Sequence, residues 1–84
     1  MTIKAKYYLD ITPDVCPLTF VKTKLMLEKM PPGEIATVRI KGAEPLENVP
    51  RSVRAHGHEV IGLVPENPAE TGPKAAHILT IKRL

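Results

Sequence analysis

Cysteine is almost absent from this chain of 84 residues, which contains only Cys16. A single cysteine cannot form an intramolecular disulfide, and secreted domains of this size usually depend on several disulfides. Apolar runs are short and never approach the roughly 20 residues that span a bilayer, and the N-terminal residues lack the apolar segment of a secretory signal. We therefore expect a cytoplasmic protein without a membrane partner.

Aromatic residues are also scarce, since the chain has two tyrosines, one phenylalanine and no tryptophan. Proteins that bind single-stranded RNA usually stack its bases on several aromatic side chains. The net charge of +3 is mild and the basic residues are scattered along the chain, so charge gives no nucleic-acid signature. We expect no direct nucleic-acid binding, although an RNA-binding module remains one alternative for a small basic domain.

The remaining composition is that of an ordinary globular protein, with 43% apolar residues, 25% charged residues and no internal repeat. A chain of this length has room for one domain at most, and a single core of that size gives only marginal stability. We expect residues 1–84 to form one domain.

Hydrophobic periodicity predicts four strands and a first helix. Residues 34–41 alternate between apolar and polar side chains, as in a strand with one buried face. A helix is expected over 17–30, because the Pro31-Pro32-Gly33 stretch cannot continue it. The strands are expected over residues 7–11, 34–41, 58–64 and 75–84, with a flexible loop over 65–74.

A second helix is expected between the second and third strands. Leu46, Val49 and Val53 have helical spacing, and Gly57 is a typical C-terminal cap. Pro50 indicates that the regular helix begins only near that residue. The order βαβαββ predicts an α+β, two-layer α/β sandwich: a four-stranded mixed sheet with both helices on one face and the other face exposed to solvent.

Cys16 directly precedes Pro17, a residue favoured at the first position of a helix. This placement makes Cys16 the expected N-cap, although serine, threonine, aspartate and asparagine are better caps. The partial positive charge of a helix N-terminus stabilises an anion by about 0.3 to 1 kcal/mol and would lower the pKa of the thiol. The residue pair therefore indicates a nucleophilic cysteine. The alternative is a buried cysteine that serves only as a small apolar side chain.

Several short motifs together resemble the TusA (SirA-like) family of sulfur carriers, and they span nearly the whole chain. The family pattern has a Leu-Asp pair in the first strand, Cys-Pro-x-Pro at the first helix, and a Met-x-x-Gly-Glu exit from that helix. A basic residue in the first helix, a hydrophobic-Pro pair in the second helix and a Gly-His pair before the third strand complete it. The corresponding residues here are Leu9-Asp10, Cys16-Pro17, Lys24, Met30 with Gly33-Glu34, Val49-Pro50 and Gly57-His58.

This resemblance implies the βαβαββ fold and a persulfide relay that uses Cys16 as its catalytic residue. A donor enzyme, such as a cysteine desulfurase or a rhodanese, would deliver sulfur to Cys16, and an acceptor protein would take it away. No cofactor is implied in the carrier itself. Three departures from the pattern leave the identities of donor and acceptor open: Val15 replaces a common arginine, Thr19 replaces the second motif proline, and residues 41–45 replace acidic residues.

The first helix carries two apolar stripes, and only one of them can be the main core face. We assign the stripe of Phe20, Thr23, Leu27 and Met30 to the core because it has the larger side chains. Leu18, Val21 and Leu25 would then form a partly exposed strip beside Cys16, which could bind a protein partner. Packing of this strip on the second helix is the alternative.

Further candidate binding residues lie around the thiol. Pro17, Leu18 and Thr19 follow it directly, and Lys22 or Lys24 could supply positive charge to a persulfide or simply be solvated. The three histidines and one cysteine lack the spacing of known zinc motifs, so we expect no metal. A protein-interaction or regulatory module in which Cys16 is incidental remains the main functional alternative.

Overall fold

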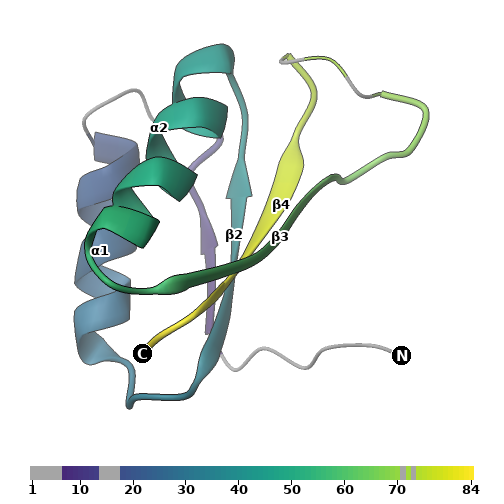
Figure 1. Ribbon diagram of the computed structural model, residues 1–84. Helices are drawn as coiled ribbons and strands as arrows, with labels where there is room; N and C mark the ends of the chain where they lie inside the picture. The colour runs from purple at the N-terminus through teal and green to yellow at the C-terminus, as the bar shows by residue number, and fades with distance from the viewer. Residues whose placement is uncertain (1–6, 14–17, 71, 73) are drawn as a thin grey trace.

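A computed structural model of the protein describes residues 7–13, 18–70, 72 and 74–84. It has the predicted order βαβαββ (Figure 1). The bounds of its elements are β1 Tyr7–Asp10, α1 Leu18–Lys29, β2 Ile35–Ile40, α2 Ala43–Ala55, β3 Glu59–Pro65 and β4 His77–Lys82.

The strands form one mixed sheet in the order β1-β2-β4-β3. β1 pairs with β2 in parallel, whereas β4 lies antiparallel to both β2 and β3. Both helices lie on the same side of this sheet (Figure 1), as right-handed crossover connections require. The predicted α+β fold with two layers is therefore confirmed.

The core lies between the sheet and the helices. Alternate residues of β2, Ala36, Val38 and Ile40, are fully buried, as the period of two along this strand predicts. Leu79 and Ile81 of β4 lie beside them in the sheet, where Val38 pairs with Leu79 and Ala36 with Ile81. The helices and the end of β1 complete the core with further buried apolar side chains: Ile11, Leu27, Met30, Val49 and Val53.

The start of α2 differs from the prediction. The helix begins at Ala43 and continues through Pro50, which lies inside it and is buried. Proline lacks the N–H donor and its ring crowds the carbonyl four residues earlier, so the helix pays a local cost at that position but does not end there. Before it, the N–H of Leu46 donates to the carbonyl of Gly42 with an N···O distance of 3.1 Å. Burial of Val49 and Val53 on the sheet stabilises the turns on either side of the proline.

The end of α2 agrees with the prediction. Gly57 has a φ of 86°, in the left-handed region that glycine adopts without steric cost. Its N–H donates to the Arg54 carbonyl at 3.0 Å, and the N–H of His58 donates to the Val53 carbonyl at 3.2 Å. This pair of bonds is the Schellman motif, so Gly57 ends the helix and directs the chain into β3.

Candidate functional site

The residues expected to perform the chemistry lie at the junction of β1 and α1. Cys16 and Pro17 fall outside the described residues, so the expected N-cap geometry stays a prediction. The chain is described up to Pro13 on one side and from Leu18 on the other. The described residues nearest to Cys16 in the sequence are therefore Pro13 and Leu18.

The buried face of α1 differs in part from the predicted one. Thr19, Thr23 and Leu27 are its buried residues, and Met30 just beyond the helix is also buried. Phe20 is only half-buried and packs its ring against that of His56, with a centroid distance of 5.0 Å. At the N-terminal end of α1, the buried face therefore contains Thr19 in place of the predicted Phe20. The Phe20 ring packs beside the end of α2 instead.

Thr19, which replaces the motif proline, is completely buried. Its carbonyl accepts a hydrogen bond of 2.8 Å from the hydroxyl of Thr23, which is also completely buried. The two threonines thus place polar side chains on the face of α1 that packs on the sheet. Thr19 therefore packs in the interior at the first turn of α1, and its side chain is not accessible to solvent.

The second apolar stripe of α1 is exposed, as predicted. Leu18, Val21 and Leu25 retain 49%, 43% and 51% of their surface accessible to solvent. This exposure excludes the alternative in which the stripe packs on α2. Positions 18, 21 and 25 lie on one face of a helix, so these side chains form a continuous apolar strip, called here the α1 strip.

Basic side chains surround the α1 strip. Lys22, Lys24 and Lys29 are exposed, and the first turn of α1 contains no acidic residue. The ammonium group of Lys24 lies 4.0 Å from a carboxylate oxygen of Glu28, a distance typical of a weak surface pair. The helix surface is therefore apolar with a positive border, which favours a partner surface of the opposite charge.

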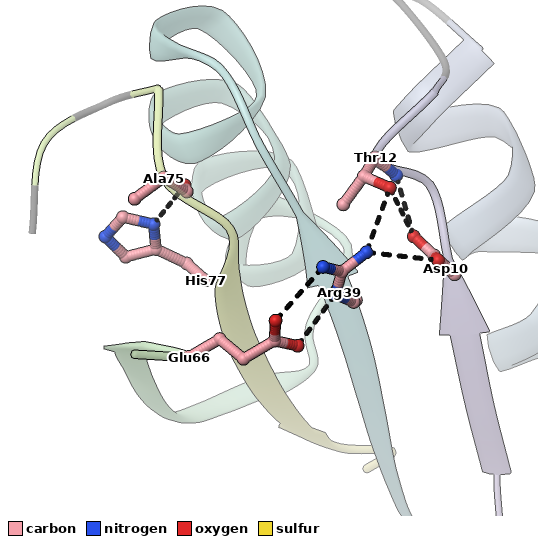
Figure 2. Close-up of polar contacts among 6 residues, drawn as sticks. All are labelled: Asp10, Thr12, Arg39, Glu66, Ala75 and His77. Atoms are coloured by element: carbon pink, nitrogen blue, oxygen red, sulfur yellow. Dashed lines mark hydrogen bonds and ion pairs between the residues drawn. The ribbon is translucent and has the colours of Figure 1, made fainter. Parts of the chain in front are cut away.

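The structure adds a polar cluster that the sequence did not reveal. Arg39, on the face of β2 away from the helices, binds both carboxylate oxygens of Glu66, with Nε–Oε2 at 2.7 Å and Nη2–Oε1 at 3.0 Å. Its Nη1 donates to Asp10 Oδ2 at 3.4 Å and to Thr12 Oγ1 at 3.3 Å (Figure 2). We call Asp10, Thr12, Arg39 and Glu66 the Arg39 network.

These contacts shift the acid–base properties of the cluster. Hydrogen bonds from the backbone and side chain of Thr12 lower the pKa of Asp10, with a smaller contribution from Arg39. Hydrogen bonds from Arg39 lower the pKa of Glu66, and the two carboxylates raise that of Arg39. All three groups are therefore charged at neutral pH. The only sequence signal was that Arg39 falls on the polar face of the predicted strand 34–41.

The three histidines and the cysteine are the residues for which the sequence predicts no metal site. His56 ends α2 and His58 precedes β3, as expected, whereas His77 is buried at the start of β4 with Nδ1 2.9 Å from the Ala75 carbonyl. Among the residues that the structure describes, no three histidine, cysteine or acidic side chains gather in a group suited to a metal ion. None of the helices described is long and apolar enough to cross a membrane.

Comparisons with known proteins find one matching family model and several similar proteins. The family model described as "Sulfurtransferase TusA" matches residues 7–71. A candidate sulfur carrier protein of Archaeoglobus fulgidus is 49% identical over 61 residues, which cover 73% of this chain and 69% of that protein. A second, from Thermotoga maritima, is 40% identical over 62 residues, covering 74% and 78% of the two chains. A third, from Methanocaldococcus jannaschii, is 38% identical over 53 residues, or 63% and 71% of the two chains. The segment matched by the family runs from β1 through β3 and includes Cys16.

Proposed function

Because this chain belongs to the TusA family, we propose that it is a sulfur carrier that holds sulfur on Cys16 as a persulfide. The single observation that carries the proposal is the position of the only cysteine, in a Cys-Pro pair two residues before α1, inside the segment that the family matches. The donor would be a cysteine desulfurase or a rhodanese, and the acceptor a second protein with a reactive cysteine. The cytoplasmic location expected from the sequence is part of the same proposal.

The transfer consists of two thiol exchange steps. The Cys16 thiolate attacks the terminal sulfur of a donor persulfide, a new S–S bond forms on Cys16, and the donor cysteine leaves as a thiolate. An acceptor thiolate then attacks the terminal sulfur on Cys16, and Cys16 leaves as a thiolate in turn. No net oxidation occurs, so the carrier needs neither an oxidant nor a cofactor. Because the chain has no second cysteine, the bound sulfur cannot be expelled by an internal disulfide.

Partner binding would use the α1 strip. Leu18, Val21 and Leu25 supply an apolar centre, and the lysines around them supply a positive border. Interfaces commonly combine an apolar centre with a polar rim, and complementary charge speeds association. We infer a partner surface with an apolar centre and acidic residues at its edge. Lys22 and Lys24 are the candidate contacts to that acidic edge.

The Cys-Pro-Leu-Thr sequence at residues 16–19 differs from the Cys-Pro-x-Pro pattern of the family at its last position. A threonine at position 19 keeps a backbone N–H that a proline would lack. If Cys16 is the N-cap, this N–H belongs to the group of donors that an N-cap side chain accepts. We infer that the variant motif favours the thiolate and persulfide anions of Cys16 more strongly than a second proline would.

The test of this function is the intact mass of the protein after incubation with a cysteine desulfurase, its pyridoxal phosphate cofactor and cysteine. We expect a gain of one or two sulfur atoms, each about 32 Da, which a reducing thiol removes. Cys16→Ser should abolish the gain without loss of the fold, because serine is a good N-cap. If the wild-type protein gains no sulfur from several desulfurases and rhodaneses, the interaction-module alternative replaces the carrier function.

A further inference from the structure

A small cavity lies between the two helices, which run side by side on one face of the sheet (Figure 1). Two buried apolar residues of the core line its floor, Leu27 of α1 and Val53 of α2. Phe20 and His56 line it as well, and their rings lie against each other with centroids 5.0 Å apart. We call this space, which has an apolar floor and an aromatic wall, the interhelical cavity.

The size of the interhelical cavity limits what can occupy it. Its volume is about 90 Å³. Sites for whole small molecules usually measure about 300 to 1,000 Å³, and an apolar cavity of about 150 Å³ holds one benzene molecule. The interhelical cavity is therefore too small for a metabolite but suits one short aliphatic side chain. A single side chain inserted into a pocket is a common anchor at protein interfaces, so the volume favours a segment of a partner protein.

The rim of the cavity on α1 adjoins the α1 strip. Lys24 and Glu28 line the cavity, and the Lys24 ammonium lies 4.0 Å from a Glu28 carboxylate oxygen. Lys24 is three residues after Val21, and Glu28 is three residues after Leu25, so each lies next to a residue of the strip on the helix surface. A partner that covers the α1 strip therefore needs to cross only this exposed pair to reach the interhelical cavity.

His58 supplies a hydrogen-bond donor on the other side of the cavity. Its Nδ1 accepts the backbone N–H of Leu84 at 3.4 Å. Burial lowers the pKa of His58, and the nearby charges of Arg83 and His56 lower it further, so the ring is neutral at pH 7. A neutral ring that accepts at Nδ1 carries its proton on Nε2. This N–H makes no hydrogen bond with the residues that the structure describes, so it can donate to a partner.

Positive charge predominates around the cavity. Of the charged side chains that line it or contact its lining residues, Lys24 and Arg83 are positive and Glu28 is negative. Arg83 belongs to this group because its Nε donates to the Leu27 carbonyl at 2.7 Å. A free donor and an excess of positive charge favour a carboxylate as the polar group beside the inserted side chain.

We propose that the interhelical cavity is an anchor site for a partner protein, which inserts one short aliphatic side chain from an acidic segment. The side chain contacts Leu27 and Val53, and the acidic residues on either side of it contact His58 and Lys24. The inference rests on the α1 strip as the partner-binding surface of the proposed function, but it uses no property of Cys16. It goes beyond that function in naming a second contact and the kind of sequence that fills it.

The experiment titrates the ¹⁵N-labelled protein at pH 7 with three acetylated and amidated tripeptides: Glu-Val-Glu, Glu-Gly-Glu and Gln-Val-Gln. NMR chemical shifts of the backbone N–H groups report where and how tightly each peptide binds. We expect Glu-Val-Glu to shift the signals of Phe20, Val53 and His58 with a Kd of about 1 to 10 mM, the range for one inserted side chain and a charged hydrogen bond. The other two peptides, which lack the side chain or the charges, should bind at least about fivefold more weakly.

Two substitutions test the polar contacts with the Glu-Val-Glu peptide. Lys24→Gln should weaken binding about two- to fivefold, because it removes a cation and leaves Glu28 to repel the peptide. Lys29→Gln is the matched control, since Lys29 is an exposed lysine of the same helix that does not line the cavity. His58→Phe keeps an aromatic ring but removes the donor, and should weaken binding at least about threefold. Circular dichroism verifies that each variant is folded, and the three peptides on the wild-type protein carry the test if a variant unfolds.

Several results would overturn the anchor site. They are the absence of saturable shifts with Glu-Val-Glu, shifts confined to residues away from the cavity, equal affinities for the three peptides, and equal effects of Lys24→Gln and Lys29→Gln. The titrations contain no sulfur donor, so they are independent of the carrier function. Peptide binding without sulfur loading of the protein would overturn only the carrier function, and loading without peptide binding would overturn only the anchor site.

Discussion

At the scale of single residues, the sequence directs attention to Cys16 as the candidate thiol, whereas it does not reveal the contacts of Arg39. Cys16 is conspicuous because its residue type, its uniqueness and the proline after it are all local features. Arg39 contacts Glu66, which lies 27 positions away and reaches it across β4, and also Asp10 and Thr12 at the end of β1. A pairing of that kind depends on strand order and register, and neither is encoded in the local pattern of a strand.

Gly57 illustrates a residue whose conformation was predictable and whose effect on stability can be measured. A Cβ atom added there would meet nothing within 4 Å, so its φ of 86° is the only source of strain. We expect Gly57→Ala to lower the free energy of unfolding by about 1 to 2 kcal/mol, the cost of a left-handed conformation for a residue with a side chain. Urea unfolding monitored by circular dichroism measures the change.

Gly62→Ala is the control for Gly57→Ala. A Cβ atom at Gly62 also meets nothing within 4 Å, and the φ of Gly62 is not positive. This variant should therefore be neutral or slightly stabilising, because alanine restricts the unfolded chain more than glycine does. Equal losses in the two variants would show that the Schellman motif of α2 does not require glycine.

At the scale of elements, the helices and strands agree with the prediction where the hydrophobic periodicity of the sequence is unbroken. The alternation in residues 34–41 predicted β2 and its buried face, and the two stripes of the first helix predicted which side of α1 is exposed. The predicted start of α2 was wrong, because Pro50 does not mark the beginning of the helix. Its apolar face toward the sheet stabilises the helix across Pro50, and this tertiary effect outweighs the local cost of the proline, which is a missing hydrogen bond and a crowded preceding turn.

The α1 strip leads to a prediction about partner binding. We expect Leu25→Asp to raise the KM for sulfur transfer from a protein donor by at least about fivefold, equivalent to a loss of about 1 kcal/mol at an apolar contact. Loading of Cys16 by a small persulfide donor should change much less, since the substitution affects docking and leaves the thiol unchanged. Val64→Asp is the matched control, because Val64 is 56% exposed but lies on β3.

Two outcomes would contradict this assignment of the α1 strip. Equal losses with the protein donor and the small donor would place Leu25 in the chemistry or in the stability of the fold. Equal effects of Leu25→Asp and Val64→Asp would show that the added negative charge, and not the position on α1, weakens transfer. Thermal unfolding of each variant separates the second outcome from a general loss of structure.

At the scale of the whole molecule, the two faces of the sheet are stabilised by different interactions. The helices bury one face in an apolar core, whereas charged side chains connect the two edges of the sheet across the other face. Apolar burial is nearly independent of pH, but ion pairs are not. The edges of the sheet should therefore give the molecule part of its sensitivity to acid.

The direction of this sensitivity follows from the lowered pKa values of Asp10 and Glu66. The ordinary values of these carboxyls are 3.8 and 4.5, and folding lowers both. A carboxyl with a lowered pKa in the folded state stabilises the fold above its unfolded value and loses this effect as the pH falls through the folded value. The contribution of the network should thus be complete at neutral pH and decline as the pH falls below about 4.5.

We therefore expect Arg39→Gln to lower the Tm at pH 7 and to flatten the decline of the Tm below about pH 4.5, compared with the wild-type protein. Glu66 should account for most of this difference, because its largest interaction is the hydrogen bond from Arg39, whereas Asp10 keeps its bonds from Thr12 in the variant. Arg51→Gln is the control. Arg51 Nη1 lies 3.9 Å from Glu47 Oε1 on the exposed surface of α2, where ion pairs contribute little to stability. Differential scanning calorimetry from pH 7 down to pH 3 measures both variants against the wild-type protein. Parallel Tm curves for Arg39→Gln and the wild-type protein would show that the Arg39 network does not contribute to acid sensitivity, even though its atoms lie within bonding distance.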